Sequence, residues 1–302
     1  MKPGIMTYCL KNALPESDRS MDKMIKIAGE EGYDLEVYSP DLWREGKNIQ
    51  KLANSARKTA DKNNVKLFSF GTGARVGEVK PDRSLKNIKE LKDAIDVAEI
   101  LGAEVICPAA IDYQPVAADQ TDPAFGMVFD RALPYIIDQM QELADYASDK
   151  NISIALVNHC YLVYLGIHQY WIAELSERPN AGACIDPGNY VYYTYGSEDP
   201  VRETVMVAEY AKLVRAGDWV VPSDSETLEK FKSAPKGQGS LFNCSGTIFG
   251  QGDVDHESCF KIIAETGYDG YVSLKVAGSS EEGPMEAVRT SMKNLTTMLE
   301  GI

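Results

Sequence analysis

Hydrophobic and polar positions follow two patterns that alternate along the whole chain. Short apolar runs bounded by turn residues are typical of buried strands, whereas apolar residues three or four positions apart are typical of amphipathic helices. The first pattern predicts eight strands, which are Ile5–Cys9, Leu35–Tyr38, Val65–Phe70, Val105–Ala109, Ile152–Val157, a strand around Cys184 and Ile185, Ala211–Val214, and Tyr271–Val276. The second pattern predicts the helices Met21–Gly32, Ile49–Asn63, Ser84–Leu101, Phe125–Lys150, Leu162–Ser176, Val201–Ala208, a crossover helix that begins at His256, and Pro284–Leu299.

Eight strand–helix units in succession predict an α/β fold, a single closed (β/α)8 TIM barrel. The length of 302 residues fits such a barrel, and no linker divides the chain, so residues 1–302 are expected to form one domain. A doubly wound open sheet stays an alternative, because alternation alone does not prove closure. The one irregular segment, Asp218–Gly252, leaves the carboxyl end of the seventh strand. We interpret it as a lid over the barrel mouth rather than a decorative loop.

Composition narrows the classes of function. The net charge of −14 argues against a nucleic-acid surface, which needs a basic stripe. No apolar run approaches the ~20 residues of a membrane-spanning helix, and the amino terminus lacks the pattern of a signal peptide. The six cysteines are dispersed, which favours reduced core thiols over disulfides. These features predict a cytoplasmic protein with no membrane partner and leave any small-molecule substrate open.

The last inward position of each of the four carboxyl-terminal predicted strands is held by Val157, Asp186, Arg215 or Lys275. Val157, Asp186 and Arg215 are evenly spaced, one β/α unit apart, and Lys275 follows after the long insert. Because parallel strands present their carboxyl ends at one rim, these side chains are expected to converge. Asp186 stands directly before a Pro-Gly turn, so a turn-capping aspartate is the alternative interpretation.

Four segments in the carboxyl-terminal half carry a resemblance to a known family. They are Ile152–His159, Gly182–Asn189, Leu213–Asp218, and Phe249–Asp255 through Gly267–Leu274. In these segments the chain resembles the xylose isomerase-like sugar isomerase/epimerase superfamily, which includes tagatose epimerases, inosose dehydratases and hydroxypyruvate isomerases. The resemblance implies a TIM barrel that acts on a small carbohydrate.

The resemblance also implies a metal site, which this sequence keeps only in part. The family pattern places a glutamate, an aspartate, a histidine and a glutamate on strands five to eight. They hold one divalent metal (manganese, zinc, magnesium or cobalt), and the two glutamates also move the proton beside the sugar carbonyl. The matching positions here hold Val157, Asp186, Arg215 and Lys275, so Asp186 is the only retained ligand.

These replacements argue against a metal cofactor. Valine cannot ligate, arginine has no free lone pair, and lysine has none until it loses its proton. At ~4 Å and an effective dielectric constant of ~20, each cation repels a divalent ion by roughly 8 kcal/mol. We therefore expect no cofactor, and we expect Lys275 and Arg215 to pair with Asp186 or a neighbouring acid. A purely structural salt-bridge cluster in a disused pocket is the alternative.

The candidate catalytic residues are His159, Lys275 and Asp186. His159 matches a site histidine of many relatives and is a candidate general base, and a loop histidine bonded to the backbone is the alternative. Lys275 would serve as the base if its pKa were depressed. The other two histidines, His168 and His256, are expected at the surface.

The candidate substrate-binding residues are Glu36, Asn158, Asn189, Arg215 and Gln251. Glu36 matches an acidic position that often faces substrate in the family. Alternatively it points outward, because Leu35 and Val37 share the other strand face. Asn189 and Gln251 suit sugar hydroxyls or turns. The aromatic run Tyr190–Tyr195 is interpreted either as a stacking surface for the ligand or as an interface patch of a homo- or hetero-oligomer.

Two interpretations of function remain. The first is a sugar isomerase/epimerase, or a lyase relative, that acts on a small carbohydrate or sugar acid through metal-free chemistry. The second is a catalytically inactive sugar-binding or partner subunit that retains the barrel. Fold analogy favours the first, and the lost ligands favour the second.

Overall fold

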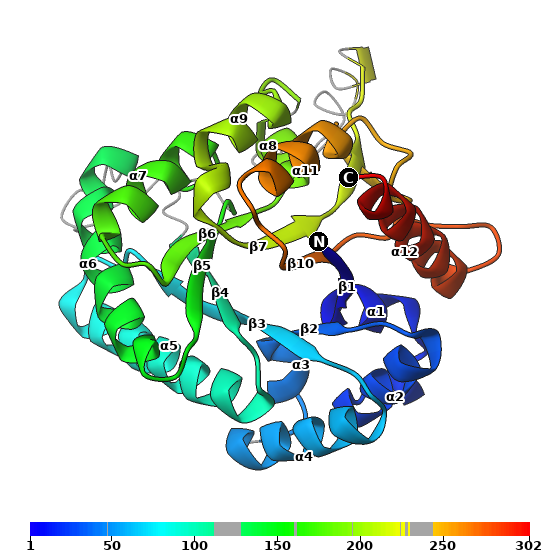
Figure 1. Ribbon diagram of the computed structural model, residues 1–302, viewed down its shortest axis with the longest axis horizontal. Helices are drawn as coiled ribbons and strands as arrows, with labels where there is room; N and C mark the ends of the chain where they lie inside the picture. Colours follow the sequence, from blue (N-terminus) through cyan, green and yellow to red (C-terminus); the bar gives the residue numbers. More distant parts are fainter. Residues whose placement is uncertain are drawn as a thin grey trace.

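Eight parallel strands close into a barrel in the computed structural model, which describes residues 1–46, 48–111, 128–159, 162–194, 196–223, 225–226, 229 and 244–302. The order around the barrel is β1-β10-β7-β6-β5-β4-β3-β2, and each neighbouring pair is parallel (Figure 1). The strands are β1 Lys2–Met6, β2 Leu35–Tyr38, β3 Leu67–Val76, β4 Val105–Ala110, β5 Ser153–Val157, β6 Ala181–Ile185, β7 Ala211–Ala216 and β10 Tyr271–Leu274. The predicted closed barrel is confirmed, and the open-sheet alternative is wrong.

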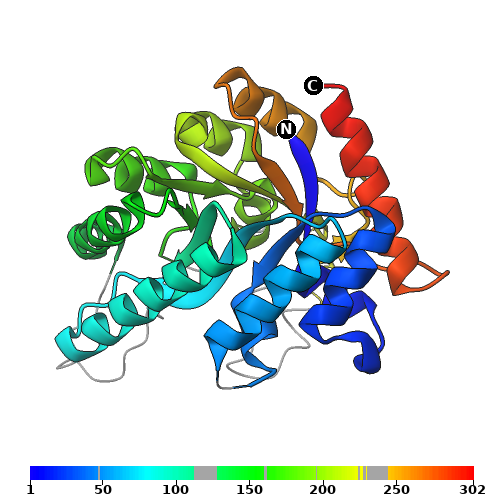
Figure 2. The same cartoon turned by 60° about the horizontal axis from the view of Figure 1, so that its bottom comes forward.

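Helices surround the strands on the outside of the barrel (Figures 1 and 2). The α-helices are α1 Thr7–Ala13, α2 Met21–Glu31, α3 Ser39–Trp43, α4 Ile49–Lys62, α5 Pro81–Leu101, α6 Phe129–Ser148, α7 Gly166–Ser176, α8 Pro187–Thr194, α9 Pro200–Val207, α11 His256–Glu265 and α12 Pro284–Glu300. Two short 3₁₀ turns are Glu16–Asp18 and Ala208–Tyr210. Gly102 ends α5 in the left-handed conformation, with φ 72°, as its position predicts.

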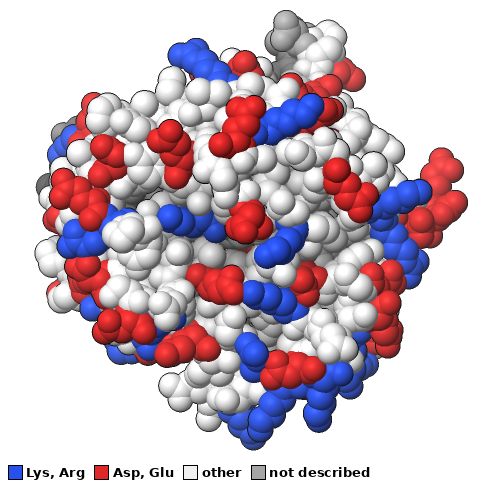
Figure 3. All heavy atoms as spheres, viewed as in Figure 1, with Lys and Arg blue, Asp and Glu red and all other residues white. Residues whose placement is uncertain are grey.

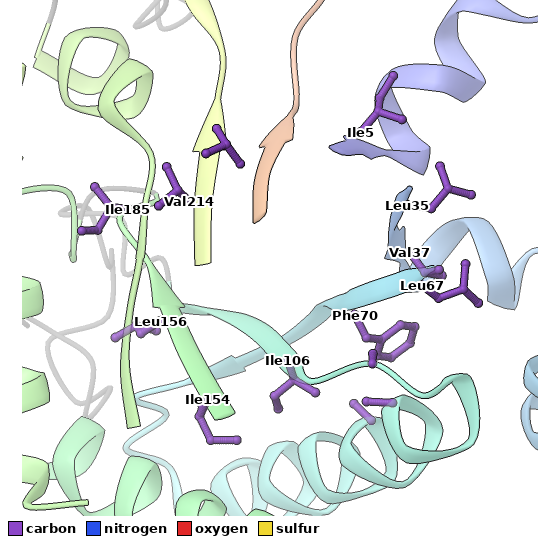
Figure 4. Close-up of a cluster of buried hydrophobic side chains, with 14 of the residues drawn as sticks. Ile5, Leu35, Val37, Leu67, Phe70, Ile106, Ile154, Leu156, Ile185 and Val214 are labelled. Carbon is purple, nitrogen blue, oxygen red and sulfur yellow. The ribbon is translucent and has the colours of Figure 1, made fainter. Parts of the chain in front are cut away.

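Both faces of the barrel strands are buried, which explains why the strands read as apolar runs. The inner layer consists of Phe68, Cys107, Ala155, Val157, Cys184 and Leu213. The outer layer packs with the helices and includes the side chains labelled in Figure 4, which are Ile5, Leu35, Val37, Leu67, Phe70, Ile106, Ile154, Leu156, Ile185 and Val214. Since this outer layer is apolar and buried, the polar side chains Glu36 and Arg215 are accommodated on the inner face of the strands.

Several boundaries differ from the prediction, and the third strand differs most, since it was expected over Val65–Phe70 and runs over Leu67–Val76. The first strand was expected over Ile5–Cys9, but it ends at Met6 because the next segment, Thr7–Ala13, buries Cys9, Leu10 and Ala13 at helical spacing. The Pro-Gly pair after Asp186 opens helix α8 rather than a turn, since proline suits the first helical position. The predicted helix over Phe125–Lys150 is described from Phe129, and its residues 125–127 lie outside the described part.

Surface and helix properties limit the partners. In the described part of the chain, no helix combines the length and apolar character needed to cross a bilayer. On the face shown in Figure 3, acidic and basic side chains are interspersed over the described residues rather than gathered into a basic stripe. That face therefore gives no support to nucleic-acid binding.

Candidate functional site

The four predicted positions lie at the carboxyl ends of four neighbouring strands. Val157 ends β5, Asp186 directly follows β6, Arg215 lies near the end of β7, and Lys275 directly follows β10. These strands are consecutive in the barrel. The sequence-predicted positions therefore share one rim, the barrel mouth.

Lys275 and Asp186 form an ion pair at this rim. The Lys275 Nζ donates to Asp186 Oδ2 and, at 2.6 Å, to Asn189 Oδ1. The other carboxylate oxygen, Asp186 Oδ1, accepts the backbone N–H of Asn189 at 3.2 Å. Asp186 is fully buried, whereas the Lys275 side chain is 14% exposed. The predicted pairing of Lys275 with Asp186 is confirmed, and both carboxylate oxygens already have partners.

Asn158 fixes the backbone beneath this pair. Its Nδ2 donates to the carbonyl oxygen of Asp186 at 2.9 Å, and its Oδ1 accepts the Asp186 N–H at 3.0 Å. The Asn189 Nδ2 in turn donates to the Asn158 carbonyl oxygen at 2.9 Å. Asn158 is completely buried, so the geometry gives it a positioning role, and its predicted contact with substrate stays a prediction.

A second ion pair lies deeper in the barrel. Arg215 donates to Glu36 twice, from Nε to Oε2 at 3.2 Å and from Nη2 to Oε1 at 2.5 Å. Glu36 is completely buried and Arg215 nearly so. Leu35 and Val37 face the helices, so Glu36 points into the barrel, and its alternative outward orientation is wrong. This is the fork-like pairing that a guanidinium and a carboxylate favour.

His159 lies at the mouth beside these cations. Its ring meets the Tyr193 ring edge-on, with centroids 5.4 Å apart. Burial, together with the positive charges of Lys275 and Arg215, lowers the pKa of His159 to about 3. The imidazole is therefore neutral at physiological pH, and one of its two ring nitrogens carries no proton.

A pocket of about 370 Å³, the inner pocket, opens at these residues. Its lining includes Tyr8, Tyr38, His159, Asn189, Tyr192, Tyr193, Arg215, Trp219 and Lys275. Tyr192 lies against Trp219, with ring centroids 4.3 Å apart. Two residues of the aromatic run after Asp186 thus line the pocket. Tyr190 instead points into the core and donates to Gln169, and Tyr195 lies outside the described residues.

The two ends of the long insert form a small antiparallel hairpin, β8 Asp218–Val220 with β9 Ser245–Thr247. Asp218 Oδ2 accepts the backbone N–H groups of Gly250 and Gly252 at 2.9 and 2.8 Å, which holds Trp219 at the pocket. Most of the predicted lid between these ends lies outside the described residues. Gln251 is exposed and is not among the described residues that line the pocket.

The two remaining histidines were expected at the surface, and that expectation is wrong. His256 is fully buried between Phe249 and Phe260, because α11 packs its first turn against the core. His168 is partly buried and stacks on Phe129 at 4.0 Å between centroids. Burial lowers the pKa of His168 to about 4 and also lowers that of His256.

Comparison of the sequence with known protein families identifies the family of this chain. The family model described as xylose isomerase-like TIM barrel matches residues 25–298. The chain belongs to the xylose isomerase-like TIM-barrel family. No curated protein gives a significant match to the sequence.

Several solved structures share the xylose isomerase-like fold at low identity. D-allulose 3-epimerase from Methylomonas sp., in complex with D-allulose, is 19% identical with a TM-score of 0.67, covering 99% of this chain and 96% of that one. The 3-keto-D-glucoside 4-epimerase from E. coli is 14% identical with a TM-score of 0.71, covering 98% and 99%. A barrel protein from Mycobacterium smegmatis in complex with magnesium is 16% identical with a TM-score of 0.70, covering 99% and 97%.

The residues at the mouth of this xylose isomerase-like barrel do not fit a divalent metal. Val157 offers no donor atom, both oxygens of Asp186 are engaged, and the Lys275 ammonium occupies the space between Asp186 and Asn189. Within the described part of the chain, no group of three or more His, Cys, Asp or Glu side chains is placed to hold a metal ion.

Sequence reasoning missed three aromatic residues of the inner pocket, which are Tyr8, Tyr38 and Trp219. Each lies within three residues of the carboxyl end of a barrel strand, a position that was available as a signal. Tyr8 was assigned to the first strand, and Trp219 was counted as part of the lid.

Proposed function

We propose that this protein is a sugar isomerase/epimerase-like barrel that binds or acts on a small carbohydrate or sugar acid without a divalent metal. The observation that carries the proposal is the Lys275 ammonium, which is held by Asp186 and Asn189 yet still lines the inner pocket. A pocket of about 370 Å³ falls in the size range of small-molecule sites. The named sugar epimerases among the structural neighbours support a carbohydrate as the ligand.

Each residue at the mouth has a chemical part in this proposal. Lys275 donates a charge-assisted hydrogen bond to a sugar oxygen, most strongly to a carboxylate. Tyr192, Tyr193 and Trp219 offer faces for the C–H surface of a sugar ring. In an isomerase step, neutral His159 takes the proton from the carbon beside the carbonyl. The electron pair of that C–H bond then forms a carbon–carbon double bond, and the π pair of the carbonyl moves to its oxygen, where the Lys275 ammonium stabilises the negative charge.

One observation favours the alternative, a catalytically inactive sugar-binding or partner subunit. A general base works best when its pKa lies near the working pH, and the pKa of His159 is lowered to about 3. Solvent exchange separates the two functions. An isomerase incorporates deuterium from D2O at the carbon beside the sugar carbonyl, whereas a binding subunit binds the same sugar without exchange.

Sugar acids are expected to raise the melting temperature more than the matching neutral sugars, because ligand binding stabilises the folded state by mass action. Lys275→Met keeps the side-chain length but removes the charge, and we expect it to weaken sugar-acid binding about 10-fold or more. Lys51→Met, at an exposed lysine of α4, is the matched control. A broad screen of sugars and sugar acids without a binder would contradict the proposal. Equal binding by wild type and Lys275→Met would discard the role of the ammonium.

The proposed absence of a divalent metal leads to a separate expectation. Protein purified without chelator is expected to contain zinc, manganese, cobalt and magnesium well below one equivalent, because two cations and a valine hold three of the four family positions. Elemental analysis by mass spectrometry measures this directly. Chelator treatment should leave both the melting temperature and sugar binding unchanged. One tightly held equivalent of metal at Asp186 would refute the argument.

A further inference from the structure

A second pocket of about 440 Å³, the outer pocket, adjoins the inner one. It lies between α1, the β8–β9 hairpin, and the segment that connects β10 to α12. Tyr8, Trp219, Lys275 and Val276 line both pockets. The two pockets are therefore neighbours, and the Lys275 side chain belongs to the lining of both.

The outer pocket differs from the inner pocket in its chemistry. Its deeper wall is formed by buried Ala13, Ala277 and Val288, and Tyr8 and Trp219 add aromatic surface. Asn12 and Ser279 are polar, but they are exposed at the rim. Lys275 is the only charged residue among the described residues of this lining, and it is already neutralised by Asp186.

The wall of the outer pocket is fixed by backbone packing. Gly278 has φ +68°, and a Cβ there would lie 2.3 Å from the Thr247 carbonyl carbon. Only glycine lets the segment after β10 approach the hairpin so closely. The hairpin is itself held by Asp218, so the pocket needs no closing movement to form.

We propose that the ligand is a glycoside or a related sugar conjugate rather than a free monosaccharide, so that any reacting carbonyl lies at a ring carbon other than the glycosidic one. The sugar unit lies in the inner pocket, and a neutral, largely apolar group attached to it lies in the outer pocket. This inference rests on the proposed function, because it assigns the second half of the same ligand. Lys275 is the one charged residue among the described residues of the outer lining, and the proposal assigns it to the sugar unit, so a phosphate in the outer pocket would find no further cation there. An apolar group strengthens binding in proportion to the apolar surface that it buries there.

Calorimetry with three forms of each sugar tests the inference. The forms are the free sugar or sugar acid, its methyl glycoside and its phenyl glycoside. We expect the phenyl glycoside to bind about 10-fold or more tightly than the methyl glycoside, because the phenyl ring buries apolar surface. Asn12→Trp is expected to fill the outer pocket from its exposed rim, so that the phenyl glycoside binds no more tightly than the methyl glycoside. Asn54→Trp, at an exposed asparagine of α4, should leave the preference for the phenyl glycoside unchanged. If Asn12→Trp does not fold, Ser279→Trp replaces it.

The possible outcomes separate this inference from the function on which it rests. Free sugars that bind while phenyl glycosides gain nothing over methyl glycosides would overturn the inference and leave the proposed function standing. A phenyl preference that persists in the folded Asn12→Trp variant would place the ring elsewhere and also overturn it. If no sugar, methyl glycoside or phenyl glycoside binds, the proposed function fails and the inference fails with it.

Discussion

Replacing Arg215 with methionine is expected to lower the free energy of unfolding by about 3–5 kcal/mol, because it leaves a buried carboxylate without its partner. Glu36 is completely buried and makes two hydrogen bonds to the guanidinium. Methionine fills much of the space but carries no charge and donates no hydrogen bond. Urea denaturation at pH 7.5 measures the loss as a shift of the midpoint.

The double variant Arg215→Met/Glu36→Leu is the control for this experiment. Replacing both partners of a buried ion pair by apolar residues is often neutral or stabilising, so most of the lost stability should return. Lys275→Met should lower the free energy of unfolding by less than Arg215→Met does. Lys275 is partly exposed, and in its absence Asp186 still accepts the hydrogen bond from the Asn189 N–H. An Arg215→Met midpoint equal to that of wild type would mean that the pair is solvated.

The fold was predictable because its strongest signals are local. Buried strands of apolar residues alternate with amphipathic helices, and Leu35–Tyr38 matches β2 without any shift. One error falls where a short helix follows a strand directly. From the sequence alone, the start of Thr7–Ala13 resembles a continuation of the first strand. The structure shows instead that Cys9, Leu10 and Ala13 lie on one buried face of a helix. Such a face depends on tertiary packing, which the sequence pattern does not display.

The sequence was enough to predict which residues lie at the candidate site, but not which of them form ion pairs with one another. The spacing of Asp186, Arg215 and Lys275 was enough to place them on one rim. The choice of Glu36 as the partner of Arg215 depends on strands β2 and β7, which are far apart in sequence and are separated in the barrel by β1 and β10. The burial of His256 and His168 was missed for a related reason, since only helix packing shows that their rings lie against Phe249 and Phe129.

Lowering the pH from about 7.5 to about 5 is expected to cost the folded protein about 4 kcal/mol of stability, mainly through its histidines. The folded-state pKa of His159 is lowered to about 3 and that of His168 to about 4, from an ordinary value of 6.5. The unfolded chain therefore takes up protons first as the pH falls. The stabilisation is fully present above pH 6.5 and is lost from there toward the folded-state pKa values. At pH 5 each of these two histidines contributes a loss of about 2 kcal/mol, and His256 acts in the same direction.

The matched variant for this prediction is His168→Phe. Phenylalanine keeps the stacking on Phe129 and removes a buried Nδ1 that has no hydrogen-bond partner among the described residues. Its stability should fall about 2 kcal/mol less than that of wild type between pH 7.5 and pH 5, as measured by urea denaturation at each pH. Burial raises the pKa of Glu203, which acts in the opposite sense, but this contribution is common to both proteins and cancels in their difference. Parallel stability curves for wild type and His168→Phe would show that His168 titrates normally and that its ring is open to water.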